Sequence, residues 1–202
     1  MLHRKNYSLH SQFSAEQGVS CQKHMNQIIT KIKNTPLTEP NFPWEKVGAW
    51  AISGMRSIGF SECSRYILVE TTDGRGLFDS QTGEKISRDN NEYKDQELQL
   101  LCKGIGPIEG ELVRMSGLSG GGLLNVTSDM WQIEIVAESW PKYQILLVEP
   151  DSSLFGAKYN KPDQFLKIWD GYELRGAGFS YNGNTLCIGE SSDLVIYNRK
   201  VS

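Results

Sequence analysis

The sequence predicts an all-β protein, built as a propeller-like array or as packed antiparallel meanders, with an N-terminal α-helix in front. The first observation is a segment that occurs twice, at about 57–79 and again at 177–198, with Ile58 and Ala177 in equivalent positions 119 residues apart. Each copy has the pattern strand, turn, strand, turn, strand, which is typical of a β-meander. The second observation is that short apolar runs alternate with polar or glycine-rich turns throughout residues 44–202. We therefore expect an extension at 1–43 and an all-β binding domain at 44–202.

The N-terminal extension contains one candidate helix, over residues 16–33. Apolar side chains recur there at helical spacing, namely Met25, Ile28, Ile29 and Ile32. This period predicts an amphipathic helix with one face available for packing. Pro36 follows directly and would end the helix.

The remaining elements follow from apolar runs and the residues that interrupt them. Charged residues with little apolar content predict a loop at 84–97, and glycines predict another at 117–122. Alternating or continuous apolar runs predict strands at 47–52, 98–102, 108–115, 131–136, 143–148 and 165–169. The offset of 119 residues is about three times the roughly 40-residue period of a propeller blade, so irregular blades would fit between the two copies.

Composition narrows the function classes. The 202 residues carry a net charge of −3, whereas a nucleic-acid-binding surface is normally basic. Residues 1–46 hold six Lys or Arg and three acids, and residues 47–202 hold fifteen and twenty-one, so the β region is the acidic part. No apolar window has the length of a signal peptide or a membrane span. The four cysteines lack the paired spacing of a zinc site. We expect a cytoplasmic protein with no metal, no cofactor and reduced cysteines.

A cluster of acidic residues is the first candidate site. It comprises Asp73, Asp79, Glu84, Asp89, Glu92, Asp95 and Glu97. A charged stretch of this kind is commonly a solvated loop. The functional alternative is an anionic docking surface for a basic partner, where charge complementarity raises the association rate.

Residues 117–121 match the G-x-S-x-G pattern of serine hydrolases, with Ser119 at the nucleophile position. That motif needs a helix directly after the serine, and residues 122–127 are poor helix formers. It also needs a histidine downstream, whereas His3, His10 and His24 all precede residue 44. We therefore expect no enzyme activity. A serine hydrolase remains the second alternative, and Ser119 is kept as a loop residue that could contact a partner.

A recurrent pattern runs through the second half of the chain. It consists of residues 117–123, residues 127–131, Glu134, the pair Trp140-Pro141 and a closing Gly-Phe-Ser-x-x-Gly-x-x-Leu segment at 178–186. The chain resembles small bacterial proteins that close on this segment, and its meanders resemble WD40-type blades. It departs from WD40 proteins because the Gly-His and Trp-Asp dipeptides do not recur.

Proteins of this kind are similar to the immunity proteins of contact-dependent growth inhibition systems. The resemblance implies a protein that binds a cognate, basic toxin domain and blocks its active site. The toxin would be a nuclease, such as an EndoU-type ribonuclease, and the protein itself would contact neither nucleic acid nor membrane. The alternative is a propeller-like adaptor in a larger complex.

Overall fold

The structure, a computed structural model, describes residues 22–91, 100–159 and 161–200. Within these ranges the chain forms an α-helix over residues 22–34, fourteen strands and two short 3-10 helices, η2 (Gly106–Ile108) and η3 (Gly156–Tyr159). The strands are β1 (Trp44–Ala51), β2 (Met55–Phe60), β3 (Tyr66–Thr71), β4 (Gly74–Asp79), β5 (Lys85–Asp89), β6 (Leu101–Lys103), β7 (Leu112–Arg114), β8 (Ser116–Gly117), β9 (Gln132–Ser139), β10 (Lys142–Val148), β11 (Phe165–Gly171), β12 (Leu174–Phe179), β13 (Thr185–Glu190) and β14 (Asp193–Arg199). The prediction of antiparallel β structure behind one helix is confirmed.

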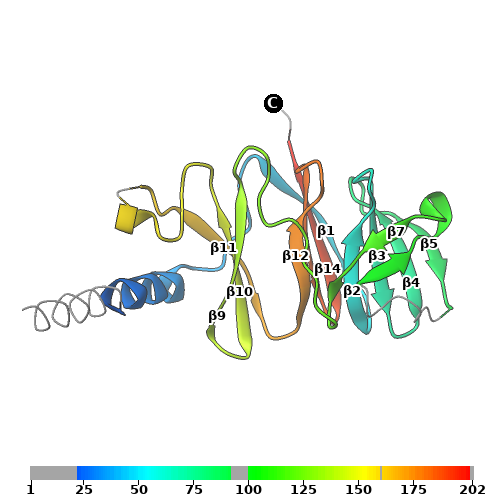
Figure 1. The fold of residues 1–202 in the computed structure, drawn as a ribbon, viewed down its shortest axis with the longest axis horizontal. Helices are drawn as coiled ribbons and strands as arrows, with labels where there is room; N and C mark the ends of the chain where they lie inside the picture. The colour runs from blue at the N-terminus through cyan, green and yellow to red at the C-terminus, as the bar shows by residue number, and fades with distance from the viewer. Residues whose placement is uncertain (1–21, 92–99, 160, 201–202) are drawn as a thin grey trace, which may run out of the picture.

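The strands form sheets that stack along the long axis of the molecule (Figure 1). The helix lies at one end, against a sheet of order β11-β10-β9. Next come a sheet of order β1-β14-β13-β12 and a sheet of order β5-β4-β3-β2-β8, and the pair β6-β7 covers the far end. Because β1 pairs with β14, the first and last strands of the β region share one sheet. The sheets are packed layers and do not close into a barrel.

Buried apolar side chains fill each gap between layers. The gap between the two repeated meanders holds Ile58, Ile67 and Ile196, among others. The next gap, between β12–β14 and β9–β11, is built on Phe179 and Ile145. Each inner sheet is therefore covered on both faces, which is why β3, β4 and β13 contain runs of buried residues.

The repeat seen in the sequence is also a repeat of hydrogen bonds. In the first copy, Ser61 N donates to Tyr66 O (2.9 Å) and Tyr66 N donates to Ser61 Oγ (3.0 Å). In the second copy, Ser180 and Thr185 make the same two bonds, at 2.9 and 3.0 Å. One serine thus supports the β2–β3 turn, and its counterpart supports the β12–β13 turn.

The two turns also share a left-handed residue. Ser64 has a φ of 63° and Gly183, 119 residues later, a φ of 71°. Glycine adopts this conformation without steric cost, whereas serine does so less readily. The turns contact each other, since Asn182 N donates to Ser64 Oγ (3.2 Å).

The helix packs on the outer face of β10. Ile28 and Ile32 lie one helical turn apart and contact Leu146 and Leu154. Thr35 N donates to Lys31 O (3.0 Å), and Pro36 then ends the helix. The first residues of the predicted helix, 16–21, lie outside the described residues.

Two predicted elements are wrong in part. Residues 85–89, expected in a loop, form strand β5, and residues 108–111, expected in a strand, lie in η2 and a turn. Strand β5 is an edge strand with mostly exposed side chains. Charged residues are common on edges because they oppose unwanted pairing, so β5 lacks the apolar signal of an inner strand.

Three cysteines lie in the described residues, and their surroundings differ. Cys102 and Cys187 are buried and Cys63 is exposed, and all three are free thiols. Burial raises the pKa of Cys102 to about 11 and raises the pKa of Cys187 further. Both buried thiols therefore stay protonated at neutral pH and act as small apolar side chains.

Candidate functional site

Two of the predicted docking carboxylates are bound within the fold. The first, Asp79, is buried and accepts hydrogen bonds from Arg65 Nε (2.6 Å), Gln81 N (2.8 Å) and Thr82 N (3.0 Å). Burial alone would raise the pKa of Asp79, but the bonds from Thr82, Arg65 and Gln81 together lower the pKa. This carboxylate shapes the β4–β5 turn.

The second, Asp89, joins neighbouring strands. Its carboxylate accepts a hydrogen bond from Asn91 N (2.8 Å) and forms an ion pair with the buried Arg75. The Asn91 amide and then Arg75 lower the pKa of Asp89. Arg75 also donates to Lys103 O (2.7 Å), so the cluster connects β4, β5 and β6.

The remaining predicted acids do not form one compact patch. Asp73 and Glu84 are exposed, but they lie at opposite ends of β4. A strand of this length separates its ends by about 17–20 Å. The other three, Glu92, Asp95 and Glu97, lie outside the described residues.

Ser119 is exposed on the loop that follows β8. It lines a hollow of about 20 Å³ with Arg56 and Glu70, which is room for about one water molecule. The following residues include bridge pairings of Leu124 and Val126 and form no helix. The strand–turn–helix geometry of a hydrolase nucleophile is therefore not formed around Ser119.

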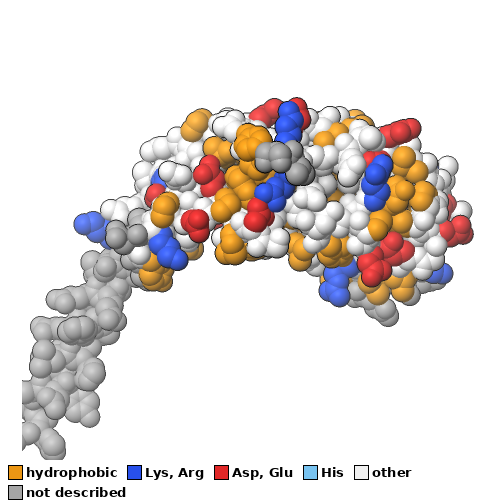
Figure 2. All heavy atoms as spheres, turned by 90° about the horizontal axis from the view of Figure 1, so that it is seen from above, with side chains coloured by type: hydrophobic (Ala, Val, Ile, Leu, Met, Phe, Trp, Pro, Cys, Tyr) orange, Lys and Arg blue, Asp and Glu red, His pale blue; other side chains and the backbone are white. Residues whose placement is uncertain are grey.

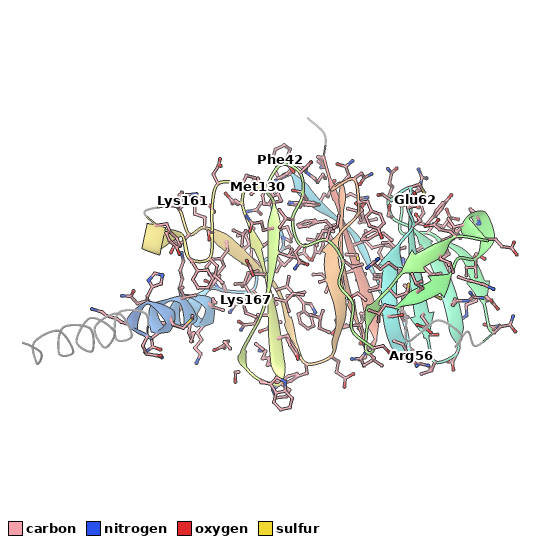
Figure 3. All side chains as sticks on the ribbon, in the orientation of Figure 1. Phe42, Arg56, Glu62, Met130, Lys161 and Lys167 are labelled. Atoms are coloured by element: carbon pink, nitrogen blue, oxygen red, sulfur yellow. The ribbon has the colours of Figure 1, made fainter. Side chains whose placement is uncertain are left out.

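A surface that the sequence reading missed lies at one end of the sheets. It is formed by the loops at 41–43, 61–65, 80–84, 125–131 and 180–184, which we call the loop rim. Four of its apolar side chains are exposed, namely Phe42 (70%), Met130 (51%), Tyr181 (49%) and Val126 (45%). Figure 3 shows Phe42, Met130 and Glu62 along this end, and Figure 2, viewed from above it, shows hydrophobic side chains among the charged ones on this face.

Hydrogen bonds hold the loops of the rim together. Lys200 N donates to Pro43 O (2.7 Å), and Arg199 donates to both carboxylate oxygens of Asp129 (3.0 and 2.5 Å). Asn198 Nδ2 donates to Gln81 O (3.1 Å). The end of β14 thus ties the loops before β1, before β9 and after β4 to one another.

The base of the rim is aromatic. Trp44 is buried, with its ring 5.9 Å from Trp131 in an edge-on arrangement and 5.4 Å from Phe179. The Arg199 guanidinium lies 5.5 Å from the Trp44 ring. A hydrogen bond from Arg199 lowers the pKa of Asp129, so this pair stays ionised and internally matched. The exposed part of the rim is therefore mainly apolar and lies over a base of packed rings.

Two exposed carboxylates also lie on the rim, both in turns of the β5-β4-β3-β2-β8 sheet. Glu62 and Glu84 are exposed in the β2–β3 and β4–β5 turns, and neither has an ion pair with a residue that the structure describes. Glu84 is therefore the predicted site residue that lies on the rim. The other rim residues were not predicted. The sequence feature that could have indicated them is an apolar or aromatic residue inside a polar turn, such as Tyr181 between Ser180 and Asn182.

Other kinds of site find little support in the described parts of the chain. No three His, Cys, Asp or Glu side chains gather there in a way that could hold a metal ion. The helices in those parts are too short or too polar to cross a membrane.

No protein-family model matches this chain, and a search of curated proteins finds no significant match. The residues of this chain are therefore the basis for inferring its function.

Proposed function

We propose that this chain is a binding protein that neutralises a cognate toxin domain by covering its active site with the loop rim. The observation that carries the proposal is the exposure of Phe42, Met130, Tyr181 and Val126 on a base of buried aromatic rings. Aromatic residues and methionine are enriched in protein interfaces, and a few such anchors supply most of the binding energy.

Rigidity supports the same proposal. The loops are tied by the bonds of Arg199, Lys200 and Asn198, so few side chains and loops need to be ordered on binding. Less ordering means that less binding free energy is lost on association. A preorganised rim is suited to tight and lasting occlusion of another protein.

Charge supports a nuclease as the target. A nuclease presents a basic surface to the phosphates of its substrate. Glu62 and Glu84 are exposed on the same rim, in turns of the β5-β4-β3-β2-β8 sheet, and would face that surface, taking the place of phosphate groups. Such charges mainly increase the rate of association and the choice of partner.

The test is co-expression with the toxin domain encoded by the neighbouring reading frame. The wild-type chain should restore growth, and the double variant Phe42→Ala, Met130→Ala should bind the domain about a hundredfold more weakly and fail to protect. Tyr172→Ala is the matched control, because Tyr172 is an exposed aromatic residue (64%) in the β11–β12 turn, at the end of β12 opposite the rim. Equal growth inhibition with and without the wild-type chain would exclude neutralisation.

The contribution of the two carboxylates can be measured separately. Changing both Glu62 and Glu84 to Lys should slow association at low salt, with a smaller effect at high salt. An adaptor function would be favoured instead if the neighbouring domain is harmless alone and the rim variants lose other, non-toxic partners.

A further inference from the structure

A cleft lies between the end of β1 and the face of β4 and β5. Its volume is about 150 Å³, and its lining includes Val69, Gly76 and Phe78. Val69 and Phe78 also belong to the buried cluster between the repeated meanders. Gly76 leaves the Phe78 ring uncovered on this side. A Cβ at position 76 would lie only 3.3 Å from that ring. The floor of the cleft is therefore apolar.

Two cations of β5 face this floor because of a bulge. Lys85 lies opposite Phe78 and Arg88 lies opposite Gly76, while the register shifts between them at Ile86. In a regular strand, residues three apart point to opposite faces. The extra residue of the bulge places both cations on the same face, and bulges are a common means of redirecting a side chain.

Neither cation has a carboxylate partner among the described residues. The Lys85 ammonium lies 5.8 Å from the centre of the Phe78 ring. The Arg88 guanidinium donates to Asn90 Oδ1 (2.9 Å) and to the backbone oxygen of Asp73 (3.2 Å). The side chain of Asp73 also lines the cleft, so its charged groups sum to one positive charge. The cleft is therefore suited to an anion that carries an apolar group.

The size of the cleft limits the ligand further. Sites for small molecules usually have volumes of about 300–1,000 Å³, so this cleft holds about one side chain. The carboxylate and the apolar group must then belong to one residue. A C-terminal apolar residue meets this condition, because its carboxylate and its side chain leave the same Cα.

We propose that the cleft formed by Val69, Gly76, Phe78, Lys85 and Arg88 binds the C-terminal residue of a peptide that ends in an apolar side chain and a free carboxylate. Phe78 and Val69 contact the side chain, and Lys85 and Arg88 bind the carboxylate. Most of the lining, including Ile52, Thr71 and Asp73, lies toward the ends of β1 and β3 opposite the loop rim, and only Phe78 and Lys85 lie near the rim. The inference therefore does not rest on the proposed function and can be tested without a toxin.

The experiment is a titration of the full chain, followed by amide NMR shifts, with three peptides. The first is acetyl-Ala-Ala-Leu with a free carboxylate, the second is its C-terminal amide, and the third is acetyl-Ala-Ala-Asp amide. The free acid should shift the amides of β4 and β5 and bind about tenfold more tightly than either amide, because charge-assisted hydrogen bonds are lost without the terminal carboxylate.

Variants separate the two halves of the cleft. Arg88→Gln and Lys85→Gln should each weaken binding of the free acid and leave the leucine amide unchanged. Gly76→Val should block the free acid by filling the floor. Lys23→Gln, an exposed change on the helix, is the control and should bind as the wild type.

The proposal is overturned if the leucine acid and its amide bind equally, or if the Asp peptide binds most tightly. It is also overturned if the shifts lie outside β4 and β5, or if a folded Arg88→Gln chain binds the acid as the wild type does.

Discussion

Between the two repeated meanders, the buried cluster consists of hydrophobic residues, whereas between the helix and the sheet of β9, β10 and β11 hydrophobic residues share the space with polar ones. The first interface has Ile58 at its centre, fully buried, with its methyl groups facing Gly176 and Gly189. These glycines allow the sheets to approach closely. Close packing of this kind is sensitive to a change of even one methylene group.

The second interface is different in composition. Cross-strand neighbours share a face, so Glu134 and Lys167, which both pair with Leu146, lie on the side of the helix. Lys167 is only 5% exposed, so its long cationic side chain takes up space in this interface. The buried Gln144 Oε1 lacks a hydrogen-bond partner among the described residues. Such groups lower the stability of an interface, so we expect the helix to detach before the meanders separate.

The largest effect should come from Ile58→Ala. Removing a fully buried side chain from a closely packed core should lower the free energy of unfolding by about 2–5 kcal/mol. Urea denaturation followed by tryptophan fluorescence measures this change. A loss below about 1 kcal/mol would mean that the meander interface is not the main core.

A smaller and local effect should follow from Ile32→Ala on the helix. The change should release the helix from Leu146 and Leu154 while leaving the sheets folded, because local regions can open independently of the global transition. Hydrogen exchange should then be faster in the helix amides and unchanged in β3 and β13. If Ile32→Ala and Ile58→Ala lower the midpoint of unfolding equally, the two interfaces unfold as one unit.

The smallest effect concerns Glu134. Burial raises its pKa above the ordinary value of 4.5. From about pH 4.5 upward the unfolded chain loses this proton before the folded chain does, so this residue lowers stability as pH rises through its folded pKa. Glu134→Gln should remove that decrease and gain less than about 1 kcal/mol at pH 7, since solvent screens a half-buried group.

The control for Glu134 is Glu45→Gln, an exposed residue paired with Lys200 (3.0 Å). The difference in stability between Glu45→Gln and the wild type should change little between pH 4 and pH 7.

The opposite pH dependence applies to Asp79, Asp89 and Asp129, whose pKa values are lowered. Their contribution is present above about pH 4 and is lost as pH falls. A flat stability profile below pH 4 would contradict this assignment.

The repeat at 57–79 and 177–198 was open to prediction because its turns are local. Ser61 and Ser180 bond to residues five positions away, and an apolar run follows each turn. Local hydrogen bonds and period-two patterns are written in consecutive residues, so the sequence alone indicated both meanders. The packing of the helix on β10 was not open to prediction, because it depends on partners more than one hundred residues away.

The acidic cluster shows why a site is harder to predict than a strand. The carboxylates at 73–89 are close together in the sequence and were therefore predicted to form one surface. In the structure Asp79 and Asp89 form ion pairs with Arg65 and Arg75. Asp73 and Glu84 lie at opposite ends of β4. The loop rim is the converse case, since Phe42, Met130 and Tyr181 are distant in sequence and share one end of the sheets.

By itself, the sequence determined the all-β class, the duplicated meander and the stretch of chain that forms the helix, because each depends on residues that are close together in the sequence. Only the tertiary structure decided which charges are neutralised by partners, which apolar residues stay exposed, and that a bulge at Ile86 turns Lys85 and Arg88 to one face. The physical reason is that burial and charge pairing depend on distances in space, which strand pairing sets between residues far apart in the chain.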